Sequence, residues 1–241
     1  MNGITELVFI LDRSGSMQGL ESDTIGGFNA MLEKQRKSGG TVLLSTILFN
    51  QESFVLHDRR DIREVPALTE KEYDVSGCTA LYDAVGGAIR HIRNIHRYIR
   101  PEDVPDHTLF VITTDGLENA STRFTLKDVR RLIEERKEKG WEFLFLGANI
   151  DAAAAARDFG LSEKNAAEFI CDGAGIRTMY DSLSRVCSRF ARTGVIEGDW
   201  KSRISEDHER RREKGGKRRG RTDSLSLRGV LRTMRGGPYV L

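Results

Sequence analysis

Residues 7–17 read LVFILDRSGSM. The apolar run predicts a strand over residues 6–11 that is buried on both faces. The strand stops at Asp12, and Ser14 and Ser16 follow with a single glycine between them. Ligands of an open parallel sheet bind beyond the carboxyl ends of its strands, so we expect one carboxylate and two hydroxyls to meet there.

Strand-like and helix-like segments alternate along the chain as far as about residue 193. Further strands are predicted at residues 41–49, 53–57, 108–113, 141–146 and 168–171, and helices at 24–37, 81–99, 126–139, from 152 onward, and at 175–192. Residues 50–52 predict a hairpin, which places one antiparallel strand at the edge of the sheet. The pattern predicts an α/β fold: a doubly wound, mostly parallel sheet with helices on both faces.

Composition and charge divide the 241 residues into two parts. Residues 209–241 hold 11 Lys or Arg and 3 Asp or Glu, although the whole chain has a net charge of only +2. Residues 205–221 have almost no apolar side chains, which is typical of a disordered segment. We predict a folded domain over residues 1–200 and a basic, disordered C-terminal extension over residues 201–241.

The sequence also bears on the cellular setting. No apolar run approaches the roughly 18 residues of a membrane-spanning helix, and the N-terminal residues show no leader pattern. We therefore expect a cytoplasmic protein. The three cysteines, Cys78, Cys171 and Cys187, are widely spaced and form no C-x-x-C pair, so we expect free thiols.

Oxygen-bearing side chains follow other strands as well. The predicted strand 108–113 leads into Thr114 and Asp115, and the loop before the helix at 81–99 contains Thr79. Asp83, four residues after Thr79, either orients that loop through hydrogen bonds or simply caps the helix or faces solvent. The sheet topology would bring these groups to the same edge as Asp12.

These residues resemble the von Willebrand factor type A (VWA) domain with its metal-ion-dependent adhesion site (MIDAS). The family's D-x-S-x-S motif matches Asp12, Ser14 and Ser16, its loop threonine matches Thr79, and its aspartate after the fourth strand matches Asp115. The resemblance covers about residues 5–195 and extends, through FLGANIDA, to bacterial intracellular members. It implies a Rossmann-like fold and a metal-binding role for the five residues.

The chemistry of the five residues agrees with that resemblance. Mg²⁺ takes about six oxygen ligands at roughly 2.0–2.1 Å. The three hydroxyls add no charge, and the two carboxylates act directly or through water, so one coordination position stays open for a carboxylate from a partner protein. We expect Mg²⁺, with Mn²⁺ or Ca²⁺ as alternatives.

The motif is compatible with two other interpretations. Asp and Ser residues also cap helices and turns, which would explain D-x-S-x-S without a metal. FILD at a strand end also begins the motif of haloacid-dehalogenase phosphatases, but that motif needs a second aspartate where this chain has Ser14. Neither a P-loop nor a G-x-G-x-x-G motif occurs.

We therefore expect a binding module and not an enzyme, one that captures an Asp or Glu of a partner protein. The resemblance to intracellular members implies an adaptor, in some cases within an ATPase-containing assembly. The alternative is binding of nucleic acid or another anionic surface through the basic extension, by charge alone. No membrane partner is expected.

Overall fold

The chain folds around one six-stranded sheet. The computed structural model describes residues 3–37 and 39–212. The strands are β1 (Ile4–Asp12), β2 (Thr41–Phe49), β3 (Ser53–Asp61), β4 (His107–Thr114), β5 (Trp141–Ala148) and β6 (Ala166–Phe169). They lie in the order β3-β2-β1-β4-β5-β6. β3 pairs with β2 in the antiparallel sense and the other neighbouring pairs are parallel, which confirms the predicted fold class.

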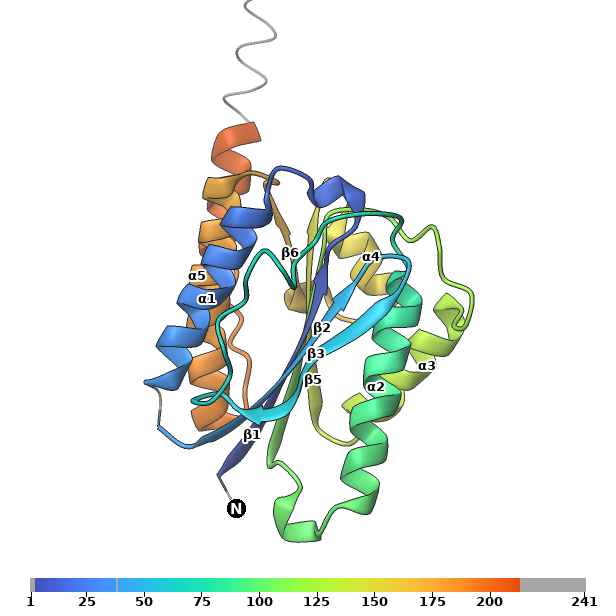
Figure 1. The fold of residues 1–241 in the computed structure, drawn as a ribbon, viewed down its shortest axis with the longest axis vertical. Helices are drawn as coiled ribbons and strands as arrows, with labels where there is room; N and C mark the ends of the chain where they lie inside the picture. Colours follow the sequence, from blue (N-terminus) through green and yellow to red (C-terminus); the bar gives the residue numbers. More distant parts are fainter. Residues whose placement is uncertain (1–2, 38, 213–241) are drawn as a thin grey trace, which may run out of the picture.

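Helices cover both faces of the sheet. The α-helices that alternate with the strands are α1 (Glu21–Arg36), α2 (Leu81–Tyr98), α3 (Leu126–Lys137), α4 (Ala152–Asp158) and α5 (Gly173–Thr193). α1 and α5 lie together on one face, and α2 and α3 lie on the other (Figure 1). Each face therefore has a hydrophobic core of its own.

Strand β1 contributes to both cores, which explains its uninterrupted apolar sequence. Leu7, Phe9 and Leu11 pack with α1 and α5, whereas Val8 and Ile10 pack with α2 and α3. Side chains alternate between the faces of a strand, and here each face is covered by helices. None of the five side chains is more than 1% exposed, so β1 is the central strand in burial as well as in position.

A buried ionic group joins β1 to β3 and α2 near the N-terminal end of β1, at the end of the sheet away from Asp12. Glu6 is fully buried, and its Oε1 accepts a hydrogen bond from Nε of Arg59 on β3 at 2.9 Å. Its Oε2 lies 2.5 Å from Nε2 of His96 in the last turns of α2. Because a buried charge needs such partners, the group ties the C-terminal end of α2 to the sheet.

The last strand lies two residues earlier than the sequence predicts. A strand was expected at 168–171, but β6 spans Ala166–Phe169 and pairs with β5 from Ala166 onward. The two alanines have low strand propensity, which hides the start of the strand in the sequence. The Asn165 side chain donates to Phe143 O at 2.9 Å and fixes the entry to β6.

The chain stays ordered beyond the predicted boundary at residue 200. Residues 202–212 are helical, so the prediction of disorder from residue 201 is wrong over this segment. Trp200 is 8% exposed, and its Nε1 donates to Lys164 O at 2.9 Å. Lys201 Nζ donates to Ala166 O at 2.7 Å, and Arg211 pairs with Asp172. The rest of the predicted extension, residues 213–241, lies outside the described residues.

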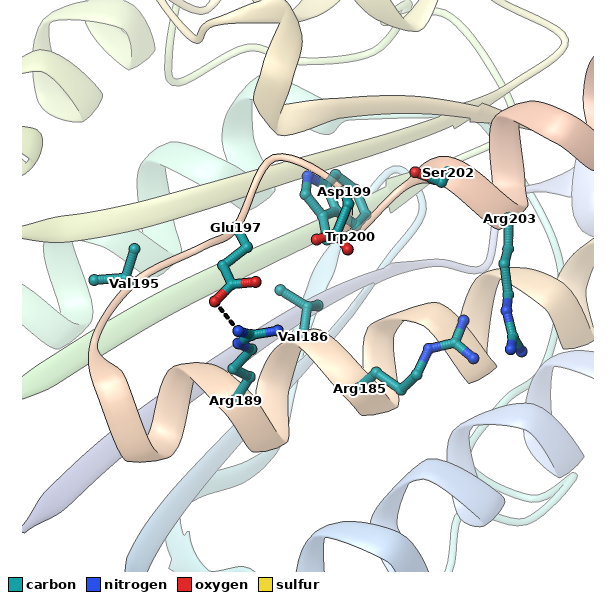
Figure 2. A pocket seen from close by; sticks show the side chains of 9 residues that line it. All are labelled: Arg185, Val186, Arg189, Val195, Glu197, Asp199, Trp200, Ser202 and Arg203. Atoms are coloured by element: carbon teal, nitrogen blue, oxygen red, sulfur yellow. Dashed lines mark ion pairs between the residues drawn. The ribbon is translucent and has the colours of Figure 1, made fainter.

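Figure 2 shows where this C-terminal segment meets α5. A surface pocket of about 270 Å³ lies between them, with Val186 and Trp200 among its lining residues. An ion pair joins Arg189 of α5 to Glu197 across the pocket. The indole and this ion pair hold the segment against α5.

None of the helices in the described ranges has both the length and the apolar character that crossing a bilayer requires.

The contact between α1 and α5 generates a test of the packing. A Cβ added at Gly27 would lie 2.3 Å from Cδ2 of the buried Tyr180 ring, whereas one at the adjacent Gly26 would meet no atom within 4 Å. Gly27→Ala should therefore lower the free energy of unfolding by about 1–3 kcal/mol through overpacking. Gly26→Ala should raise it by about 0.5–1 kcal/mol, because alanine is the better helix former.

Urea denaturation of the two single variants measures both changes. Equal effects of the same sign would contradict the close approach of α1 to Tyr180.

Candidate metal centre

The polar strand ends meet at the switch point of the sheet. β1 and β4 are neighbours, and the chain leaves β1 toward β2 on one side and leaves β4 toward β5 on the other. The crevice at such a point is the usual ligand position in open α/β sheets. Asp12 ends β1, and Asp115 directly follows β4, so the topology brings the two carboxylates together.

Asp12 is held in a buried, hydrogen-bonded position. Asp12 is 2% exposed. Oδ1 accepts from the Ser14 backbone N–H at 2.7 Å, and Oδ2 accepts from Thr114 Oγ1 at 2.6 Å. Burial raises the pKa of Asp12 above its usual value even though these hydrogen bonds act in the opposite direction. A cation beside Asp12 would favour its ionised form.

The two serines of the motif connect Asp12 to Asp115. Ser14 Oγ and Ser16 Oγ lie 3.1 Å apart, and Ser16 Oγ donates to Asp115 Oδ1 at 2.5 Å. Burial is the main cause that raises the pKa of Asp115; the Ser16 hydrogen bond opposes the rise and the negative charge of Asp12 adds to it. The strand ends therefore hold two carboxyl groups whose charge is only partly compensated.

Thr79 reaches the same place from the loop before α2. A Cβ added at Gly116 would lie 3.5 Å from Ser16 Oγ and also 3.5 Å from Thr79 Oγ1, so one point beside Gly116 is close to both hydroxyls. Thr79 is 3% exposed. The structure thus gathers all five predicted residues, from three separate loops, at one edge of the sheet.

Two residues that the sequence does not single out hold Thr79 in place. The Thr79 backbone N–H donates to Asn119 Oδ1 at 2.9 Å, and the Asn119 N–H donates back to Thr79 O at 3.0 Å. Glu118 accepts from the backbone N–H groups of Tyr82, Ala120 and Ser121 at 2.7–2.9 Å. The loop after Asp115 is therefore bonded directly to the loop and helix that carry Thr79.

Asp83 completes this connection from the side of α2. Its carboxylate accepts from the backbone N–H groups of Thr122, Arg123 and Phe124 at 2.8–3.0 Å. Burial alone would raise the pKa of Asp83, but these hydrogen bonds outweigh it and lower the pKa below its usual value. The Asp83 carboxylate thus orients the segment 122–124, which lies after Asp115, and not the Thr79 loop that the sequence suggests.

A thiol lies at the edge of the site. Cys171 Sγ is 3.8 Å from Asp115 Oδ2, just after β6. Burial, followed by the charge of Asp115, raises the pKa of Cys171 to about 11, so the thiol stays protonated near neutral pH and can donate to the carboxylate. All three cysteines are free, as the sequence predicts.

The gathered groups fit a hard divalent ion. Neighbouring oxygens of an octahedral Mg²⁺ shell lie about 3 Å apart, close to the Ser14–Ser16 separation of 3.1 Å. Among the described residues, no three His, Cys, Asp or Glu side chains are grouped so that they could hold a metal. A metal here therefore needs the hydroxyl oxygens of Ser14, Ser16 and Thr79.

Comparison with known proteins finds similarity in structure but not in sequence. No protein-family model and no curated protein sequence matches the chain. The vWF domain of the type V pili tip protein Mfa5 from Porphyromonas gingivalis is similar with a TM-score of 0.57 at 12% identity, over 80% of this chain and 98% of that chain. Manganese-loaded TRAP protein from Plasmodium vivax is similar with a TM-score of 0.52 at 17% identity, over 74% of each chain.

Proximal thread matrix protein 1 from the mussel byssus, in a structure with a zinc-occupied MIDAS motif, is also similar. Its TM-score is 0.53 at 12% identity, and the match covers 76% of this chain and 46% of that chain. The present chain therefore spans less than half the length of the mussel protein.

Topology and comparisons together define the fold. A mostly parallel sheet between two helical layers, with a polar crevice at its switch point, is a Rossmann-like α/β architecture. Within that class, the chain has the von Willebrand factor type A fold, as the sequence resemblance predicts.

The bonds around Asp83 generate a second prediction. Asp83→Ala removes the acceptor of three backbone N–H groups in a part-buried loop, and should lower the free energy of unfolding by about 2–4 kcal/mol. Asp128→Ala is the matched control, because Asp128 is an exposed carboxylate in the capping box of α3. It should lower that free energy much less than Asp83→Ala does, because solvent can replace the hydrogen bonds of Asp128.

Denaturant titration at pH 7 measures both losses. The pKa of Asp83 is lowered in the folded protein, so its contribution should be present above about pH 4, the usual range of the carboxyl, and should fade as the pH falls below it. Equal losses in the two variants would contradict a special role for Asp83.

Proposed function

We propose that the chain is a divalent-cation-dependent protein-binding module. The ion is held by Asp12, Ser14, Ser16, Thr79 and Asp115, and its open position takes an Asp or Glu carboxylate of a partner protein. One observation carries the proposal: three hydroxyls and two buried carboxyl groups from three separate loops lie close together at the switch point of the sheet.

Each residue has a distinct part in this proposal. Ser14, Ser16 and Thr79 would supply neutral oxygen ligands, and Asp12 and Asp115 would supply the negative charge that attracts the ion. The ion, when bound, supplies a Lewis-acidic position for an anionic ligand. The five side chains leave about one of the six coordination positions unfilled, and a carboxylate of a partner protein can take that position. Mg²⁺ is proposed as the ion, with Mn²⁺ or Ca²⁺ as alternatives.

The contacts of the site support binding in preference to catalysis. The groups described around the crevice are carboxyls, hydroxyls and one protonated thiol. The described contacts of the five histidines include those with Thr46, Asp58, Glu6, Glu168 and the Phe190 ring, and none is with a residue of the proposed site. A general base would need to reach the groups of the site. The cytoplasmic, bacterial setting and the ATPase-containing assembly implied by the resemblance stay predictions.

Metal titration tests the proposal directly. The wild-type chain should bind one Mg²⁺ or Mn²⁺ ion, and Asp12→Ala should weaken that binding by about 100-fold or more, since the carboxylate either ligates the ion or orients its waters. Asp103→Ala is the control, because Asp103 lies in the short turn before β4, at the opposite end of the sheet, and should leave the affinity unchanged.

Isothermal titration calorimetry measures the affinities, and circular dichroism checks that each variant is folded. Equal metal binding by the wild type and a folded Asp12→Ala variant would remove the proposed site.

The basic extension remains the competing binding element. Replacing Lys214, Lys217, Arg218, Arg219 and Arg221 by glutamine in the full-length chain removes five of the eleven basic side chains of residues 209–241 without shortening the chain. If the crevice binds the partner, chelator-sensitive capture of proteins from a cell extract should be unchanged. If the extension binds the partner through its charge, capture should persist in the presence of the chelator and should fall in this variant.

A further inference from the structure

An exposed leucine lies next to the proposed metal centre. The exposed large apolar residues of the described ranges are Phe54, Val55, Tyr98, Leu117 and Val195. Isolated apolar side chains on a surface are ordinary. Leu117, at 70% exposure, differs by its position, because it comes two residues after Asp115 in the segment that joins β4 to α3 (Figure 1).

The backbone places Leu117 beside the hydroxyls of the site. The preceding residue, Gly116, is the one at which an added Cβ would lie 3.5 Å from both Ser16 Oγ and Thr79 Oγ1. Consecutive Cα atoms are about 3.8 Å apart. The Leu117 backbone is therefore one residue from the point where two of the proposed ligands meet.

The segment after Leu117 is fixed by hydrogen bonds. Glu118 accepts three backbone N–H groups and the Ser121 hydroxyl, and Asn119 exchanges two hydrogen bonds with the backbone of Thr79. An apolar side chain on such a fixed backbone loses little conformational entropy when a partner covers it. Leu117 thus exposes an apolar side chain from a backbone position next to the metal centre.

We infer that Leu117 forms an apolar contact subsite of the metal centre, and that the partner segment carries an apolar side chain within about two residues of its acidic one. This inference rests on the proposed function. The ion accepts any carboxylate of suitable reach, so it provides little discrimination between acidic segments. An apolar contact next to it adds affinity in proportion to the area buried and selects among those segments.

A displayed library of random linear peptides tests the subsite. The full-length chain, loaded with Mg²⁺, is immobilised, and bound peptides are eluted with a chelator. Eluted sequences should be enriched in Asp or Glu with Leu, Ile, Phe or Met one or two positions away. Leu117→Ser should keep the acidic enrichment and lose the apolar one, and should bind a synthetic peptide of the enriched sequence about ten-fold more weakly.

Tyr98→Ser is the matched control. Tyr98 is 78% exposed and is the last residue of α2, whereas Thr79 lies just before the first residue of that helix. This variant should select the same peptides as the wild type.

The outcomes separate this inference from the proposed function. If the chelator elutes no acidic peptides, the proposed function fails and the subsite fails with it. If acidic peptides elute without an apolar neighbour, or with the same neighbour from Leu117→Ser, the subsite is overturned and the proposed function stands. Weaker Mg²⁺ binding by Leu117→Ser would assign Leu117 to the packing of the metal centre and would also overturn the subsite.

Discussion

The burial of two carboxyl groups at the end of the central strands is the constraint on which the site depends. Asp12 and Asp115 are 2% and 3% exposed, and burial raises the pKa of both. Removing a carboxylate from water is unfavourable unless donors or a cation replace the lost hydration. The loops supply part of that replacement through hydroxyls and backbone N–H groups, and a divalent ion would supply the rest.

Hydrogen bonds link the carboxyl groups of the site to α2. The segment 116–124 after Asp115 donates to Asp83, and Glu118 and Asn119 of that segment bind the backbone around Thr79. The positions of Asp115 and Thr79 are therefore linked. At the other end of α2, His96 meets the buried Glu6 of β1. A shift of α2 would disturb contacts at both ends, so the helix is a fixed support for the site.

Local patterns in the sequence predict most of the fold and the composition of the candidate site. The continuous apolar run of β1 and the apolar residues of α2, which recur every three or four positions, can be recognised in the sequence because the buried positions repeat regularly. D-x-S-x-S can be recognised because it directly follows a strand. Glu118, Asn119 and Cys171 could not be found in this way, because they bind residues 36–56 positions distant. The start of β6 and the helix at 202–212 were missed because tertiary contacts, including the burial of Trp200, stabilise segments of weak local propensity.

Diffraction from crystals of the full-length chain soaked in Mn²⁺ would test the central claim most directly, because the anomalous signal of manganese locates the ion without reference to any other variant. The account predicts one strong anomalous peak within about 2.5 Å of Ser14 Oγ and Ser16 Oγ, beside Thr79 and Asp115, with solvent or an anion in one position of its shell. An anomalous map with no peak beside these residues, or with its strong peak at a different cluster of oxygens, would contradict the account.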